Sequence, residues 1–416
     1  MTLRLEKFLS PKHPNDGSLF QKGTKTPKPP EYAILSHRWG DHEVLFTDMS
    51  TGIPADTEGW SKIKESCKLA KSRGIDWIWI DTCCIDKWSN TELSEDLNLM
   101  YTYYARAKEC YAYLSDVAWT PKGSGGRLTR EGTGEKSEWF TRGWTLQELL
   151  APGTPCKGND DQPSITSGTM IFFDKDWKEI GAKADPDLCT EIAKHSRIRP
   201  EYITSPGTHQ NASIAMKLSW AATRITEKLV DRIYSLLGVF DLQMPILYGE
   251  GETNALMRLQ LELIAQSDDQ SIFAWMESSR YGEPDPCGML ATSLSDFSDS
   301  NDIVNFPIKD KEKPLYGMTK EGLAFRVFNG GKAMHNLEGR SNSSKETVML
   351  ACSKSEEPAH PHVDRRNVVV IDLRGKGGSL QRVGSGKWNL SNEFDVPTSK
   401  WWLNPGLRRV FYIKQG

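Results

Sequence analysis

Apolar runs and stretches of helical periodicity alternate over the first half of the chain. The apolar runs at residues 32–35, 75–80 and 110–114 predict three strands. Residues 75–80 are apolar at nearly every position, as in a parallel strand that is buried on both faces. The pattern therefore predicts a central sheet.

Helical spacing fills the two gaps between these runs. Apolar residues recur every three or four positions over residues 60–70, and Gly74 follows as a helix stop. Ser89 and Glu92 form a capping-box pattern, and the apolar face of a second helix follows over residues 93–104. Strand, helix, strand, helix, strand is the order of a parallel βαβαβ unit.

A polar cluster follows each predicted strand, at residues 36–38, 81–84 and 115–116. The carboxyl ends of neighbouring parallel strands line the ligand crevice of an open sheet. The three clusters are therefore expected to converge on one edge, although ordinary loop starts and helix caps would leave the same pattern.

The segment after the third strand contains two further features. Residues 120–136 hold five glycines among mixed charges, which predicts a mobile surface loop that covers the crevice edge. Residues 138–152 predict a turn and then a short helix that begins near Trp144 and ends before Pro152. Another strand is predicted at residues 170–173.

The second half of the chain changes from helical to β-type patterns. Residues 212–266 are helical in pattern, and an apolar stripe predicts a helix over residues 225–237 that stops at Gly238. Short β-type runs separated by Gly, Ser and Asn turns follow a Gly/Pro-rich boundary. We expect an α/β domain over residues 1–180, a helical extension over 181–276 and a β-rich domain over 288–416.

Composition excludes several classes of protein. Lys and Arg number 52 and Asp and Glu number 55 in 416 residues, and the resulting net charge of −3 argues against a nucleic-acid binder. The 14 Trp, 12 Tyr and 14 Phe exclude a fully disordered chain. No apolar run approaches the ~20 residues of a membrane span, and residues 1–12 have no signal-peptide core. A cytoplasmic location is therefore expected.

The eight cysteines do not form a disulfide or zinc pattern. Cys83 and Cys84 are adjacent, and the nearest approach to metal spacing is Cys352 with His360 and His362 in a polar stretch. We expect reduced thiols that pack as small apolar groups, and no metal.

Three sequence blocks resemble the fungal heterokaryon incompatibility (HET) domain family. They are YAILSHRWGD at residues 32–41, WIDTCCIDK at 79–87 and FTRGWTLQEL at 140–149. Shorter blocks at residues 231–238, 244–251 and 267–271 resemble the downstream part of these domains. The resemblance covers about residues 1–276 and is specific, because several long blocks occur in the family's order.

The HET family is distantly similar to Toll/interleukin-1 receptor (TIR) domains, many of which hydrolyse NAD⁺. Residues 34–38 are similar to the first TIR box, and WTLQEL at residues 144–149 is similar to the TIR segment that carries the catalytic glutamate. The resemblance implies a TIR-like sheet, Glu148 as catalytic carboxylate, NAD⁺ as substrate without a further cofactor, and homo-oligomerisation on activation in cell death. Thr145 stands where TIR domains have Cys, and Trp39 stands near where they have Gly.

Residues near the predicted crevice are candidates for substrate binding. Arg38 suits a dinucleotide phosphate, His37 or Trp39 suits a flat ring, and Asp81 suits ribose hydroxyls. The same residues would serve as surface groups, helix caps or ion-pair partners in a purely structural role. Ser36 and Trp144 complete the set, with backbone capping and core packing as their structural alternatives.

Two other functions stay open at this stage. The first is a TIR-like signalling module that acts only by assembling with partners. The second is a thiol hydrolase in which Cys84, activated by His37, is the nucleophile.

Overall fold

The computed structural model describes residues 30–51, 57–119, 128–155, 168–276, 286–305, 316–319, 322–328, 344–354, 368–376, 379–383, 389–391 and 408–413. The chain divides into two compact units. The first holds residues 1–210, 225–227 and 234–247, and the second holds residues 211–224, 228–233 and 248–416.

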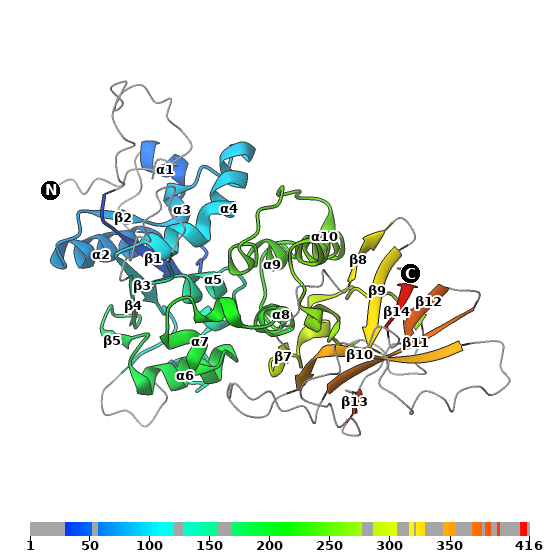
Figure 1. Ribbon diagram of the computed structural model, residues 1–416. Helices are drawn as coiled ribbons and strands as arrows, with labels where there is room; N and C mark the ends of the chain where they lie inside the picture. Colours follow the sequence, from blue (N-terminus) through cyan, green and yellow to red (C-terminus); the bar gives the residue numbers. More distant parts are fainter. Residues whose placement is uncertain are drawn as a thin grey trace, which may run out of the picture. The chain divides into compact units, whose positions relative to one another are not determined.

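A five-stranded sheet with the order β2-β1-β3-β4-β5 forms the centre of the first unit (Figure 1). Its first four strands in this order are parallel, and β5 is antiparallel to β4. The strands are β1 (Tyr32–His37), β2 (Trp77–Trp79), β3 (Glu109–Tyr113), β4 (Thr169–Phe173) and β5 (Glu179–Ala182). The predicted α/β architecture with a mostly parallel sheet is confirmed.

The helices of the first unit begin and end largely where the sequence signals lie. The Ser89 hydroxyl accepts a hydrogen bond from the Glu92 amide, so Ser89 caps α4 as predicted. Gly74 has φ +74°, which suits glycine just after a helix. The helices are α1 (Phe46–Thr51), α2 (Glu58–Ser72), α3 (Asp81–Cys84), α4 (Asn90–Arg106), α5 (Thr145–Leu150), α6 (Pro186–Ser196) and α7 (Pro200–Thr204), with 3₁₀ turns η1 (Glu138–Thr141), η2 (Thr208–Asn211) and η3 (Gly238–Phe240).

The strand order places a topological switch point between β1 and β3. The chain passes from β1 to β2 on one side and then returns to β3 on the other side of β1. Ligands of open α/β sheets bind outside the carboxyl ends of the strands at such a point. Strand β1 also runs two residues beyond its apolar run, so Ser36 and His37 lie within it and point to opposite faces.

The predicted helix over residues 225–237 is wrong. The Ile225 amide donates to Thr141 O (2.7 Å), and the Gly143 amide donates to Ile225 O (2.9 Å), so Ile225 is in extended backbone. Ile225 is 58% exposed and Leu229 is 65% exposed, and only α9 (Asp231–Tyr234) is helical. Pairing with residues 141–143 uses the backbone groups that a helix would need.

The glycine-rich segment is only partly described, and residues 120–127 lie outside the described residues. The second half, residues 128–136, is a closed hairpin with a bridge between Thr129 and Lys136. Leu128 is fully buried, and the Glu131 amide donates to Asp116 O (2.9 Å). This half of the segment is therefore fixed to the end of β3 rather than a free loop.

The second unit combines helices with a nine-stranded sheet in the order β13-β11-β10-β9-β14-β12-β6, where β7 pairs with β10 and β8 with β9 (Figure 1). Its helices include α8 (Ile214–Ala222), α10 (Gly251–Gln266) and the 3₁₀ turns η4 (Gln270–Phe273) and η5 (Leu294–Phe297). The strands are β6 (Pro286–Cys287), β7 (Ile303–Asn305), β8 (Tyr316–Thr319), β9 (Gly322–Phe328), β10 (Ser344–Lys354), β11 (Val368–Lys376), β12 (Ser379–Val383), β13 (Asn389–Ser391) and β14 (Arg408–Ile413). Strands β9, β10, β11 and β14 overlap the short β-type runs of the sequence at residues 323–327, 347–352, 367–373 and 409–413. Within the described ranges, every helix is too short or too polar to cross a membrane.

Candidate functional site

A buried carboxylate lies at the switch-point end of β1. The Ser36 hydroxyl, from β1, donates a hydrogen bond of 2.5 Å to Oε2 of Glu148 in α5. The Trp139 indole Nε1 donates to the same Ser36 oxygen at 2.9 Å. The exposed fractions are 0% for Ser36, 1% for Trp139 and 3% for Glu148, so the three side chains form a buried chain of hydrogen bonds.

Local contacts at both ends hold α5, and with it Glu148, in place. The Thr145 hydroxyl donates to Trp139 O (2.6 Å) and to Arg142 O (2.9 Å), which closes the turn before the helix. At the other end, the Lys183 ammonium donates to Leu149 O (2.9 Å) and Pro152 O (3.2 Å). A cation suits the carbonyl end of a helix, although burial lowers the pKa of Lys183 to about 8.

Tyr104 and Cys110 are two of the groups that lie near Glu148. The Tyr104 hydroxyl donates to Leu35 O (3.0 Å), beside Ser36. Burial, and after it the nearby charge of Glu148, raises the pKa of Tyr104 well above its usual range. The same two causes, in the same order, raise the pKa of the Cys110 thiol. Tyr104 and Cys110 therefore stay neutral beside the carboxylate.

A second polar cluster lies around His37. Its Nε2 is 3.7 Å from Glu43 Oε2, and its Nδ1 is 3.8 Å from Asp81 Oδ1. Lys62 also pairs with Glu43. Burial alone would raise the pKa of Glu43, but His37 and Lys62 outweigh it and lower that pKa to about 2. Glu43 is thus a carboxylate held charged by two basic neighbours.

Trp39 and Asp81 extend this second cluster. The Trp39 indole donates to Asp81 Oδ2 at 2.7 Å, and the Lys87 ammonium lies 3.6 Å from the centre of the Trp39 ring. A cation at this distance covers the ring face. A ring stacked on this face of Trp39 would have to displace Lys87.

Arg38 is ion-paired above the end of the sheet. Its Nη1 lies 2.8 Å from Glu138 Oε2, and Arg130 Nη2 lies 2.5 Å from the other Glu138 oxygen. Asp116, after β3, accepts bonds from the Ser137 hydroxyl (2.6 Å) and the Glu138 amide (2.7 Å). Residues 137–138 therefore connect the segments that follow β1 and β3.

The structure thus sorts the predicted site residues into separate groups. Ser36 is hydrogen-bonded to Glu148. His37 and Trp39 both lie against Asp81. Arg38 is ion-paired with Glu138. Trp144 is half-buried at the N-cap position of α5, one turn before Glu148. The sequence reasoning missed Trp139, Glu43, Tyr104 and Glu138 as partners, although Trp139 and Glu138 directly precede the FTRGW motif.

The two adjacent thiols lie in α3. The backbone amide of Ile80 donates to Cys84 Sγ at 3.4 Å, and both cysteines are buried. The hydrogen bond to Cys84, together with burial, raises the pKa of the Cys83 thiol well above its usual range. A nucleophilic cysteine needs a stabilised thiolate, and the environment of Cys83 favours the neutral thiol.

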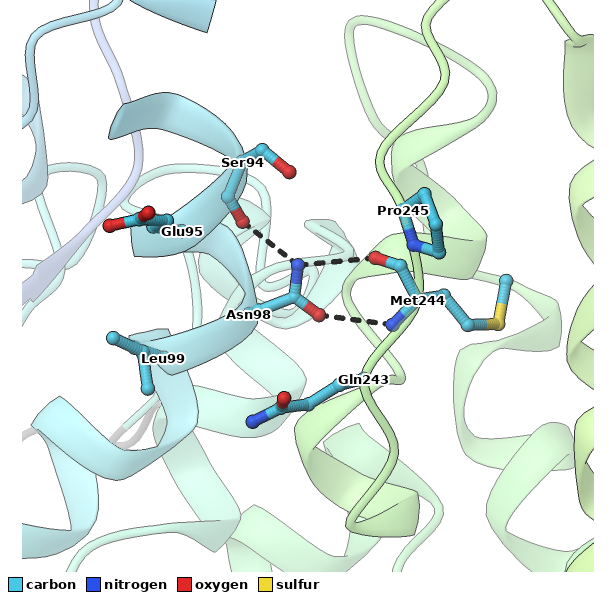
Figure 2. A pocket seen from close by; sticks show the side chains of 7 residues that line it. All are labelled: Ser94, Glu95, Asn98, Leu99, Gln243, Met244 and Pro245. Carbon is cyan, nitrogen blue, oxygen red and sulfur yellow. Dashed lines mark hydrogen bonds between the residues drawn. The ribbon is translucent and has the colours of Figure 1, made fainter. Parts of the chain in front are cut away.

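A pocket of about 290 Å³ lies between α4 and the segment after η3 (Figure 2). The Asn98 amide joins its two sides, because Nδ2 donates to Met244 O (3.2 Å) and Oδ1 accepts from the Met244 amide (3.1 Å). None of the predicted site residues lines it. The lining residues are Ser94, Glu95, Asn98, Leu99, Gln243, Met244 and Pro245.

Comparison with known proteins adds family evidence. The sequence profile described as "Heterokaryon incompatibility protein (HET)" matches residues 32–133. The chain is also 35% identical over 243 residues to vegetative incompatibility protein HET-E-1 of Podospora anserina, a match that covers 58% of this chain and 16% of that protein. No solved structure matches the chain significantly. Residues 32–133, which include Ser36 and the residues around His37, are therefore similar to the heterokaryon incompatibility (HET) domain family.

Proposed function

We propose that this chain is an incompatibility effector that cleaves the nicotinamide–ribose bond of NAD⁺, with Glu148 as its catalytic carboxylate. The single observation that carries the proposal is the hydrogen bond between Ser36 and Glu148 at the switch point of a parallel sheet. The name of the relative from Podospora anserina supports the part of the proposal that concerns incompatibility.

A buried carboxylate suits this chemistry. Cleavage of the bond passes through an oxocarbenium-like transition state, which a nearby carboxylate stabilises by its negative charge. The interaction is strong where water is excluded, and Glu148 is only 3% exposed. Nicotinamide leaves as a neutral molecule, so the reaction does not require a general acid.

The burial of Glu148 implies that the substrate must open the site. Residues 137–138 bond to Asp116 after β3, and Arg38 after β1 is ion-paired with Glu138. In the proposed reaction the pyrophosphate takes the place of the Glu138 carboxylate on Arg38, because phosphate and carboxylate suit the same guanidinium. We propose that homo-oligomerisation in the cytoplasm favours this open state.

Nicotinamide release from NAD⁺ by the purified full chain tests the proposal. Wild type is compared with Glu148→Gln, which keeps the side-chain size and removes the charge. Turnover is expected to fall by at least ~10²-fold, which corresponds to about 2.7 kcal/mol of barrier. Glu179→Gln, a change at a carboxylate 52% exposed on β5, is the matched control. Unchanged turnover in Glu148→Gln would remove the catalytic assignment.

A second candidate is a module that acts by assembly without catalysis. The observation that favours it is that Arg38 and Glu148 are both engaged within the chain, while Trp88 is 81% exposed. Growth arrest on expression of Glu148→Gln, with normal cellular NAD⁺ levels, would support this candidate. Loss of growth arrest in the same folded variant would support the enzyme.

A further inference from the structure

We propose that Trp139 and Ser36 are positioning residues that keep Glu148 ionised and in one orientation. The consequence for catalysis rests on the proposed NAD⁺ cleavage. The effect on Glu148 itself is independent of that function and can be measured separately.

The hydrogen bonds run from Trp139 through Ser36 to Glu148. An indole N–H can only donate, so Ser36 Oγ is the acceptor of the 2.9 Å contact with Trp139. The Ser36 hydroxyl donates its single proton to Glu148 Oε2, 2.5 Å away. In this arrangement Oε2 is the acceptor, and a proton on this oxygen would require the Ser36 hydroxyl to turn to another acceptor.

This direction matters because Glu148 is buried. Removal from water disfavours a charged carboxylate, whereas a hydrogen bond donated to the charged form favours it. The Trp139 contact also polarises the Ser36 hydroxyl, which strengthens the bond that the hydroxyl donates. Ser36 and Trp139 thus supply part of the hydrogen bonding that water would otherwise give the Glu148 carboxylate.

Strand pairing and ring packing hold the two positioning residues in place. Ser36 lies in β1, in register with Ala112 of β3. The Trp139 ring packs edge-on against Phe140 (5.0 Å between ring centres) and Phe172 (5.7 Å). With the ring held by two aromatic neighbours, its N–H stays directed at Ser36, as a preorganised site requires.

Ser36→Ala and Trp139→Phe in the full chain test the inference. Ser66→Ala is the matched control, because Ser66 is also fully buried but donates to Ile63 O (2.9 Å) rather than to Glu148. Protonation of Glu148 is followed by infrared difference spectroscopy of its carboxyl band, identified by the loss of that band in Glu148→Gln. Nicotinamide release is measured over the same pH range.

In Ser36→Ala we expect the pH at which half of Glu148 is protonated to rise by about one pH unit. The midpoint of the acidic limb of the pH–activity curve should rise by the same amount. Trp139→Phe should give a smaller shift in the same direction, and Ser66→Ala none. A spectroscopic shift without NAD⁺ cleavage in any variant would support the positioning role and overturn the proposed function. An unmoved carboxyl band in folded Ser36→Ala and Trp139→Phe would overturn the positioning role, whatever the activity.

Discussion

Ser36 and His37 are neighbours in β1, yet their side chains belong to different networks on opposite faces of the strand. Ser36 donates to Glu148, whereas His37 lies between Glu43 and Asp81. The period of two along a strand makes this separation unavoidable. One short motif therefore serves both the buried carboxylate and a charged cluster.

The ion pair between Arg38 and Glu138 leads to a prediction about NAD⁺ affinity. Glu138→Gln removes the carboxylate that competes with phosphate, so KM for NAD⁺ should fall by about two- to fivefold, the scale of a partly exposed ion pair. Arg38→Ala should raise KM for NAD⁺ more than for nicotinamide riboside, which lacks the pyrophosphate. Steady-state kinetics with both substrates measure this difference.

An equal change for both substrates in Arg38→Ala would mean that Arg38 shapes the loop and does not bind phosphate. Arg73→Ala is a suitable control, because Arg73 pairs with Glu109 and Glu179 on the sheet.

Cys84→Ser should leave NAD⁺ turnover nearly unchanged. Cys84 is buried, and its sulfur already accepts a bond from the Ile80 amide. Nicotinamide release by wild type and variant at equal concentration is the measurement. Abolished turnover in a variant that still unfolds cooperatively would restore the thiol mechanism.

The charged cluster around Glu43 predicts how stability depends on pH. The pKa of Glu43 is lowered from 4.5 to about 2, so its contribution to stability is complete above pH 4.5 and is lost as the pH falls towards 2. The full contribution is roughly 3 kcal/mol by linkage. Urea unfolding of wild type and Lys62→Met between pH 7 and 3 measures it.

Lys62→Met removes one of the basic groups around Glu43, which include His37, Lys62 and Lys87. The loss of unfolding free energy between pH 4.5 and 3 should be smaller in this variant than in wild type. Lys68→Met, at an exposed pair with Glu65, is expected to behave as wild type. If the free energy of unfolding fell with pH by the same amount in all three proteins, the assigned role of Lys62 would be contradicted.

Gly238→Ala should be strongly destabilising. A Cβ at Gly238 would lie 2.1 Å from the Cβ of Tyr101 in α4, an atom close to the backbone that cannot rotate away. We expect a loss of at least ~2 kcal/mol in the free energy of unfolding. In the control Gly40→Ala the nearest atom is 3.8 Å away, and the stability should change by no more than ~0.5 kcal/mol. Equal stability of both variants would show that α4 adjusts to the added methyl group.

Local signals in the sequence were sufficient to predict much of the fold. Hydrophobic runs predicted β1 to β4, and the Ser89 cap and the Gly74 stop predicted helix ends that the structure confirms. These features depend on neighbouring residues, so the chain encodes them without reference to distant parts. The residues of both polar networks that the sequence named also lie at strand ends or helix starts.

Only the tertiary structure decided which of these residues meet. Ser36 and Glu148 are 112 positions apart, and their contact depends on where α5 lies relative to β1. The apolar spacing of residues 225–237 resembled a helix, but pairing of Ile225 with Thr141 and Gly143 took its backbone hydrogen bonds instead. Periodicity reports the local chain alone, whereas backbone and side-chain partners are settled by the elements that pack around them.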